Sequence, residues 1–265
     1  MARFLNHLCG LGLLALMAAP PALASEPEAC PGLIARAKPT LHWAALANDE
    51  VGLSFVGHAT FLIESPQGVR IATDYNDYVR PPGPLDVATM NKAHSTHFSH
   101  LPDPSIAHVL RGWNPAGGPA RHDLTVRDVR IRNVSTNIRN WGDGGTDYDG
   151  NSIFVFETTQ LCIAHLGHLH HTLTPEHLKK LGRIDVLLVP VDGGYTMTAT
   201  DMMDVLKAIN APLMVPMHYF NPSTLNRFLA LAREHFPVEF SSTAAITTSR
   251  ATLPQHPKVL VLPGR

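Results

Sequence analysis

Histidines recur along the sequence at points where strands are expected to end. Three of them stand at three-residue intervals in "KAHSTHFSH", residues 92–100, behind a run with strand character. Two more lie in "AHLGH", residues 164–168, and another follows "LMVPM", residues 213–217. Histidine is the commonest metal ligand in proteins, and a catalytic zinc site needs only about three protein ligands with one position left for water. The candidate metal ligands are His97, His100, His165, His168 and His218.

Ligands at several strand ends require a sheet that brings those ends to one edge. In the first half of the chain, three short runs are rich in β-forming residues: "VGLSFV" (51–56), "ATFLIES" (59–65) and "VRIATD" (69–74). "SPQG" lies between the second and third runs and is typical of a hairpin turn. These runs therefore predict short strands, with a hairpin between the second and the third.

Helices and buried strands alternate in the second half. "TPEHLKKLG" predicts a short helix with Thr174 as its N-cap and Gly182 as its terminator. Two amphipathic helices follow, residues 199–210 and residues 223–236, the latter capped by Ser223, with the buried strand "LMVPMH" between them. The whole order predicts an α/β fold in which helices cover a sandwich of two sheets.

The composition favours a globular protein with a sizeable core. The chain has 265 residues and 45% hydrophobic content, which is enough for a sizeable core. Its formal net charge is −1, only 16% of residues are charged and no polybasic stretch occurs. Neither nucleic-acid binding nor a membrane-surface helix is expected, and a small-molecule substrate is the expected partner.

The first 24 residues resemble an export signal. Arg3 supplies a positive start, residues 8–19 form a short apolar run, and residues 22–24 offer small side chains for cleavage. The alternative is an uncleaved membrane anchor, but the run is shorter than the ~20 residues that a bilayer span needs. We expect a periplasmic or secreted protein with no stable membrane insertion after signal cleavage.

The rest of the chain divides into a leader and one domain. Residues 25–50 hold several prolines among small residues and are expected to lie over the domain surface, and the domain itself spans residues 51–265. Cleavage would leave two cysteines, Cys30 and Cys162. They could pair in an oxidising compartment, or Cys162 could be a buried free thiol within its strand.

Six motifs occur in the order that one enzyme superfamily uses. They are "VGHATFLIES", "IATDY", "THFSH", "AHLGH", "VPVDGGYTM" and "VPMHY", and the match runs over residues 51–220. This order resembles the metallo-β-lactamase superfamily, in particular the branch of L-ascorbate-6-phosphate lactonase-like hydrolases and N-acylphosphatidylethanolamine phospholipase D. The resemblance implies an αββα sandwich with a metal site at one edge.

The metal motif differs from that of the superfamily. The signature His-x-His-x-Asp-His aligns with residues 95–100, where Ser95 and Ser99 replace the first histidine and the aspartate. The later ligand pair aligns with His165 and His168, so an imidazole stands where the family has a bridging carboxylate. We therefore predict one ion rather than two, zinc first, with manganese or iron as alternatives because geometry and availability decide the metal. The other interpretation is that these histidines hydrogen-bond one another around water.

Two carboxylates are candidates for a catalytic role. Asp74, in "IATDY", matches an acidic residue near the cleft of this branch and would orient a ligand imidazole. Asp103, in "HLPDP", supplies a carboxylate if its loop folds inward; Asp192 is a similar candidate, and both are also typical of loop caps. His94 is expected to be structural, because reaching the missing ligand position needs a one-residue shift that reverses its face. His58 either lines the same edge or packs at a strand end.

The resemblance implies a hydrolase. A bound metal would acidify water for attack on an ester, lactone or phosphodiester bond. The alternative from another class is a catalytically silent domain that binds a ligand or metal in the periplasm without turnover, because this fold hosts several functions. A true β-lactamase is disfavoured by the branch motifs and the altered signature.

Overall fold

The computed structural model describes residues 46–140 and 142–264. The expected signal peptide, residues 1–24, and residues 25–45 of the expected leader lie outside the described residues. None of the described helices is long and apolar enough to cross a membrane. The domain boundaries expected from the sequence stay predictions.

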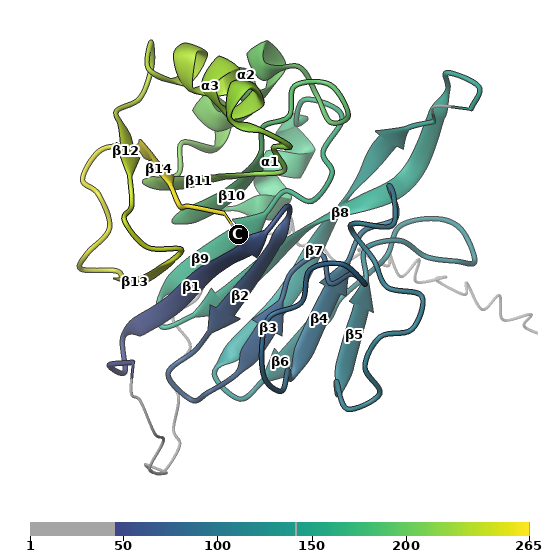
Figure 1. Cartoon of the computed structure of the whole chain (residues 1–265). Helices are drawn as coiled ribbons and strands as arrows, with labels where there is room; N and C mark the ends of the chain where they lie inside the picture. The colour runs from purple at the N-terminus through teal and green to yellow at the C-terminus, as the bar shows by residue number, and fades with distance from the viewer. Residues whose placement is uncertain (1–45, 141, 265) are drawn as a thin grey trace, which may run out of the picture.

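The first sheet is built mainly from the first half of the chain (Figure 1). Its order is β13-β1-β2-β3-β4-β5. The strand β13 and the hairpins β1 to β3 pair antiparallel, and β3, β4 and β5 pair in parallel. Its strands are β1 (Glu50–Gly57), β2 (Thr60–Glu64), β3 (Arg70–Ala72), β4 (Val87–Met90), β5 (His108–Arg111) and β13 (Ala245–Ser249).

The second sheet has the order β12-β14-β11-β10-β9-β8-β7-β6. Strands β6 to β9 pair antiparallel, and β9, β10, β11, β14 and β12 pair in parallel. Its strands are β6 (Asp123–Val126), β7 (Val129–Arg139), β8 (Thr146–Thr158), β9 (Leu161–His165), β10 (Val186–Pro190), β11 (Leu213–Met217), β12 (Val238–Phe240) and β14 (Lys258–Val261).

Three helices follow β9 in the described residues: α1 (Pro175–Leu181), α2 (Ala199–Ile209) and α3 (Pro222–Ala232). The predicted caps of α1 are confirmed, since Thr174 accepts a hydrogen bond from the His177 backbone and Gly182 ends the helix. The predicted cap of α3 is wrong. Asn221, not Ser223, caps it by accepting from the Thr224 backbone at 2.9 Å, because Pro222 occupies the first helical position, where no donor is needed.

The alternating side chains of the strands divide the core into three layers. In β8, Phe154 and Phe156 point between the two sheets, whereas Ile153 and Val155 point outward, where α2 and α3 cover the second sheet (Figure 1). The outer face of the first sheet is covered instead by loops that carry residues such as Tyr75. The predicted sandwich is confirmed, and the described helices cover only the second sheet.

Cys162 lies in β9 and is disulfide-bonded. This decides against a free thiol at that position. Cys30, the partner expected from the sequence, lies outside the described residues.

Candidate metal centre

Strand ends from both sheets meet at one edge of the sandwich. His58 follows β1, Asp74 follows β3, His97 lies in the loop after β4, Asp192 follows β10 and His218 follows β11. Parallel strands bring their carboxyl ends to the same edge, so side chains far apart in sequence become neighbours there.

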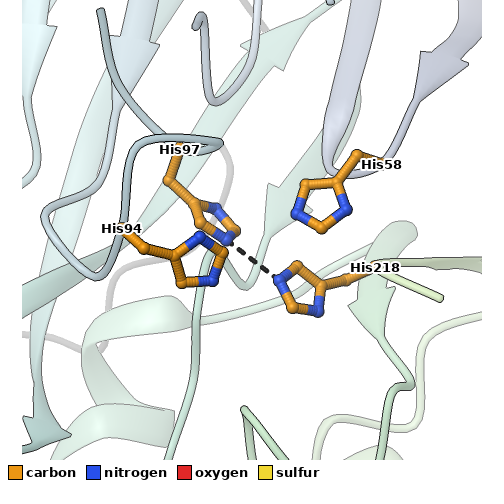
Figure 2. A group of neighbouring side chains, drawn as sticks. All are labelled: His58, His94, His97 and His218. Carbon is orange, nitrogen blue, oxygen red and sulfur yellow. Dashed lines mark hydrogen bonds between the residues drawn. The ribbon is translucent and has the colours of Figure 1, made fainter. Parts of the chain in front are cut away.

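Four histidines form a cluster at this edge: His58, His94, His97 and His218 (Figure 2). Each offers one ring nitrogen, and these four nitrogens all lie within 4.8 Å of one another. The Nε2 atoms of His97 and His218 are 3.0 Å apart. Two imidazoles on one tetrahedral zinc ion would have nitrogens about 3.3 Å apart, so the spacing is close to that of a ligand pair.

A buried carboxylate lies behind each member of this closest pair. Asp74 Oδ2 is 2.5 Å from His97 Nδ1, and Asp192 Oδ1 is 3.0 Å from His218 Nδ1. Both histidines are fully buried. Carboxylates in this position orient the ring and fix which nitrogen faces a metal. Both Nε2 atoms therefore point into the cluster.

The two facing nitrogens need a hydrogen atom or a metal ion between them. If His97 and His218 each donate Nδ1–H to their carboxylate, both Nε2 atoms carry lone pairs that face each other at 3.0 Å. A proton or a metal ion must separate them. Burial, followed by the nearby imidazoles, lowers the pKa of His97 well below its ordinary value, so a buried imidazolium is unfavourable. The donor set therefore fits a metal ion.

The two carboxylates differ in electrostatics. Burial raises the pKa of Asp74 well above its ordinary value, and the hydrogen bond from Asn91 at 3.0 Å offsets part of that shift. Burial alone would also raise the pKa of Asp192, but hydrogen bonds from His218, Thr196 and backbone N–H groups lower it overall. Without a cation, Asp74 is thus the carboxylate that can be protonated, and a neutral His97 then donates Nε2–H to His218 Nε2. With a cation bound, Asp74 accepts a hydrogen bond from His97 Nδ1–H instead.

The other two histidines of the cluster are joined by a hydroxyl. Thr96 Oγ1 is 2.8 Å from His58 Nε2 and 2.8 Å from His94 Nδ1. His94 Nε2 is 2.9 Å from His168 Nε2, and His168 Nδ1 is 2.5 Å from His170 Nε2. These contacts form a continuous hydrogen-bonded chain.

The direction of that chain is set at its far end. The Arg139 backbone N–H can only donate, and its partner is His170 Nδ1 at 2.7 Å. Burial lowers the pKa of His58 to about 3 and those of His94 and His170 to about 4. These rings are neutral at pH 7, so each donates its single N–H to the next group in the hydrogen-bonded chain. Thr96 then donates its O–H to His58 Nε2.

The structure brings three of the five predicted ligands to this region. His97 and His218 are members of the cluster, and His168 contacts His94. His165 is buried outside the cluster, with Nε2 donating to the Ala59 carbonyl at 2.8 Å and Nδ1 accepting from Gly167 N–H at 3.1 Å. Both of its nitrogens are thus used in holding the backbone.

Two other predicted residues lie away from the cluster. His100 is exposed, and its ring packs on Phe98 at 4.9 Å between centroids. Asp103 is also exposed, and its Oδ1 accepts from the Ser105 backbone and hydroxyl at 2.9 and 2.7 Å. Asp103 therefore caps a turn.

His94 is part of the cluster, although a structural role is predicted for it from the sequence. The reason is local: β4 ends at Met90, and the following residues form turns in which Asn91 N–H donates to the His97 carbonyl and His97 N–H to the His94 carbonyl. No strand register exists at residue 94, so the alternation of faces does not apply. The three-residue spacing of the histidines was the available signal.

The backbone at the site is held in an uncommon conformation. His58, Asp74 and His218 have φ values of 51°, 40° and 57°, in the left-handed region that non-glycine residues rarely adopt. Such residues gather at functional sites, where the surrounding contacts hold them in place. Gly167 has φ 61°, and a Cβ there would lie 2.4 Å from both Asn91 and Asn151.

Comparisons with known proteins agree with this fold and site. A family model described as "Beta-lactamase superfamily domain" matches residues 52–218. A UPF0173 metal-dependent hydrolase of Methanoculleus marisnigri is 28% identical over 180 residues, which cover 63% of this chain and 80% of the relative. A UPF0173 protein of Pyrococcus furiosus is 37% identical over 176 residues, which cover 62% of this chain and 80% of the relative.

A solved structure from Thermotoga maritima aligns with this chain with a TM-score of 0.61 and 29% identity. The alignment covers 81% of this chain and 100% of that chain, which is assigned to the Zn-dependent hydrolases of the metallo-β-lactamase superfamily. The two-sheet sandwich is thus the metallo-β-lactamase fold. The chain belongs to the beta-lactamase superfamily and, within it, to the UPF0173 family. The predicted superfamily is confirmed, and the narrower lactonase-like branch stays a prediction.

Proposed function

We propose that the chain is an exported metal-dependent hydrolase with one zinc ion at an altered, histidine-only site. His97 and His218 would be its anchoring ligands. His94 would become the third by exchanging its hydrogen bond to His168 or Thr96 for the ion, and His58 would border the remaining position. The hydrolase names of its relatives support the reaction class. The lactonase-like motifs support an ester, lactone or phosphodiester of a small molecule as substrate.

One observation carries this proposal: two buried Nε2 atoms face each other at 3.0 Å, and each ring is backed by a carboxylate. When bound, zinc supplies an acidified water and a polarised scissile oxygen. Asp74 and Asp192 hold the rings of His97 and His218 in the orientation that a metal ion needs, so this pair does not have to reorganise on binding.

Export is supported by two features. The first 24 residues have the charge, apolar run and small residues of a signal peptide. Cys162 is disulfide-bonded, and disulfides persist in oxidising compartments outside the cytoplasm. N-terminal sequencing of the chain recovered from a bacterial periplasmic fraction tests this, with Ser25 as the expected first residue.

The metal is tested by mass spectrometry on the chain purified without chelator or affinity metal. The expected content is about one zinc per chain, lost in a His97→Ala/His218→Ala double variant. His100→Ala is the matched control, because His100 is exposed outside the cluster and its loss should leave the metal content unchanged. Two ions per chain would contradict the single site, and no uptake of zinc or manganese would overturn the metal proposal.

A silent binding protein is the second candidate. It is favoured by the two carboxylates nearest the cluster, Asp74 and Asp192, which bond the far nitrogens of their histidines and so do not face the metal position. Zinc-loaded protein that hydrolyses neither p-nitrophenyl acetate nor bis(p-nitrophenyl) phosphate above the His97→Ala/His218→Ala background would establish this alternative.

A further inference from the structure

A cavity of about 680 Å³ opens directly beside the histidine cluster. His94, Thr96 and His168 line it on the cluster side, and Ile138 and Phe220 are among the apolar residues that line it. Its volume is in the range of small-molecule sites, which are mostly apolar with a few placed polar groups. A molecule in this cavity would therefore contact both the cluster and an apolar wall.

Two aromatic side chains in this wall are more than half exposed. Tyr195 and Phe220 are 58% and 54% exposed, and their ring centroids are 5.4 Å apart. The Phe220 ring is also 5.5 Å from the rings of His58 and His218. Exposed aromatic surface that adjoins a functional site is typical of ligand binding, since covering it removes apolar area from water.

The polar groups of the cavity do not favour an anion. The rings of His94, His168 and His170 bond one another, with 2.9 Å between His94 Nε2 and His168 Nε2 and 2.5 Å between His168 Nδ1 and His170 Nε2. The Arg139 guanidinium donates to the carbonyls of Gly194 at 2.9 Å and Tyr195 at 3.4 Å, and also to that of Thr196. An anionic group would compete with these carbonyls for Arg139, whereas a neutral group would not.

We infer that this cavity takes the apolar group of a neutral ester or lactone, with the carbonyl at the histidine cluster and the apolar group against Tyr195 and Phe220. The inference rests on the proposed hydrolase function and narrows its substrate class. A charged phosphodiester is then a poorer substrate than a neutral ester or lactone, although the metal chemistry alone permits both classes.

The first test compares p-nitrophenyl acetate, butyrate and hexanoate with bis(p-nitrophenyl) phosphate, using the zinc-loaded full chain. We expect kcat/KM to rise about tenfold or more from acetate to hexanoate, because each buried methylene favours the bound state. Phe220→Ala should lower the hexanoate-to-acetate ratio at least threefold, and Tyr195→Ala should lower it in the same direction. Phe240→Ala is the matched control, since Phe240 is 60% exposed on β12 and does not line the cavity.

The second test does not depend on turnover. The neutral fluorescent probe N-phenyl-1-naphthylamine should bind the metal-free full chain and the Phe240→Ala control, with a Kd about fivefold weaker in Phe220→Ala. Equal binding by all three proteins, or none, would overturn the apolar site.

The two proposals fail in different ways. Ester hydrolysis with a flat chain-length dependence, or a preference for the phosphodiester, would overturn the substrate inference and leave the hydrolase in place. Zinc-loaded protein that binds the probe but hydrolyses neither the esters nor the phosphodiester would overturn the hydrolase, and the substrate assignment with it.

Discussion

The two halves of the histidine cluster are held in different ways. His97 and His218, the carboxylate-backed pair, each face a buried aspartate with one nitrogen and the cluster with the other. His58 and His94, the hydroxyl-linked pair, share the single hydroxyl of Thr96. The first pair is fully buried, whereas the second is partly exposed and its member His94 lines the cavity.

This difference predicts two roles: the carboxylate-backed pair anchors the metal ion, and the hydroxyl-linked pair can rearrange. A carboxylate fixes the tautomer and strengthens the ligand nitrogen, and burial prevents the ring from turning. One hydroxyl has one hydrogen, so it can donate to only one member of the hydroxyl-linked pair and must accept from the other. We expect the carboxylate-backed pair to supply most of the metal affinity and the hydroxyl-linked pair to leave room for substrate.

The largest expected effect is loss of a carboxylate-backed ligand. His97→Ala or His218→Ala should raise the Kd for zinc about a thousandfold, since zinc sites with four ligands bind with about 10–16 kcal/mol in total. His94→Ala should raise it about tenfold, because another group or water can take its place. Competition titrations with a fluorescent zinc chelator measure both. Equal increases of the zinc Kd in variants of the two pairs would contradict the different roles assigned to them.

The second largest effect is the loss of folding stability on acidification. His165 is the residue that tests it, because it lies outside both pairs. Burial lowers the pKa of His165 to about 4 from 6.5. Between those values the unfolded chain binds a proton that the folded chain does not, so the free energy of unfolding falls as pH falls. From about pH 7 to about pH 4, the single site costs about 3 kcal/mol.

The matched variant is His165→Gln, whose amide can still donate to the Ala59 carbonyl but does not titrate. Urea unfolding at both pH values should show that wild type loses about 3 kcal/mol more than the variant. The difference should be the same with and without zinc. A zinc-dependent difference would show that His165 is coupled to the metal after all.

Much of the fold follows from sequence because its signals are local. Thr174 and Gly182 mark the ends of α1 by capping chemistry that needs no tertiary contact. The cap of α3 shows the limit: Asn221 and Ser223 are both good caps, and the position of Pro222 between them decides. The strands of the first half are equally local, since their β-rich runs correspond to β1, β2 and β3.

The site was less predictable because it depends on turns. His97 and His218 follow from motif order, but the inclusion of His94 depends on the turn after β4, which alternation cannot describe. His165 occupies a ligand position by alignment, yet both its nitrogens bond the backbone. Hydrogen-bond partners far away in sequence decide which ring nitrogens are free to bind a metal. The Ala59 carbonyl, 106 residues from His165, takes up Nε2 of that histidine.

A smaller effect is expected when one backing carboxylate is neutralised. Asp74→Asn keeps the shape of the side chain but removes the charge behind His97, and should weaken zinc binding about 10- to 100-fold. Asp103→Asn is the control, since Asp103 is exposed and caps a turn with Ser105. An unchanged zinc Kd in Asp74→Asn would mean that ring orientation is set by packing alone.

The smallest expected effect is on the hydroxyl-linked pair. Thr96→Val keeps the volume but leaves His94 Nδ1 and His58 Nε2 without their shared partner, so zinc should bind about fivefold more weakly. Thr96→Ser retains the hydroxyl and should bind as wild type does. Long-range ¹H–¹⁵N spectra of the histidine rings provide a readout that a merely structural role would not change: a mixture of His94 tautomers in Thr96→Val and a single one in Thr96→Ser. A single tautomer in both variants would show that His168, rather than Thr96, sets the tautomer of His94. The partner that controls His94 would then be the chain of imidazoles and not the hydroxyl.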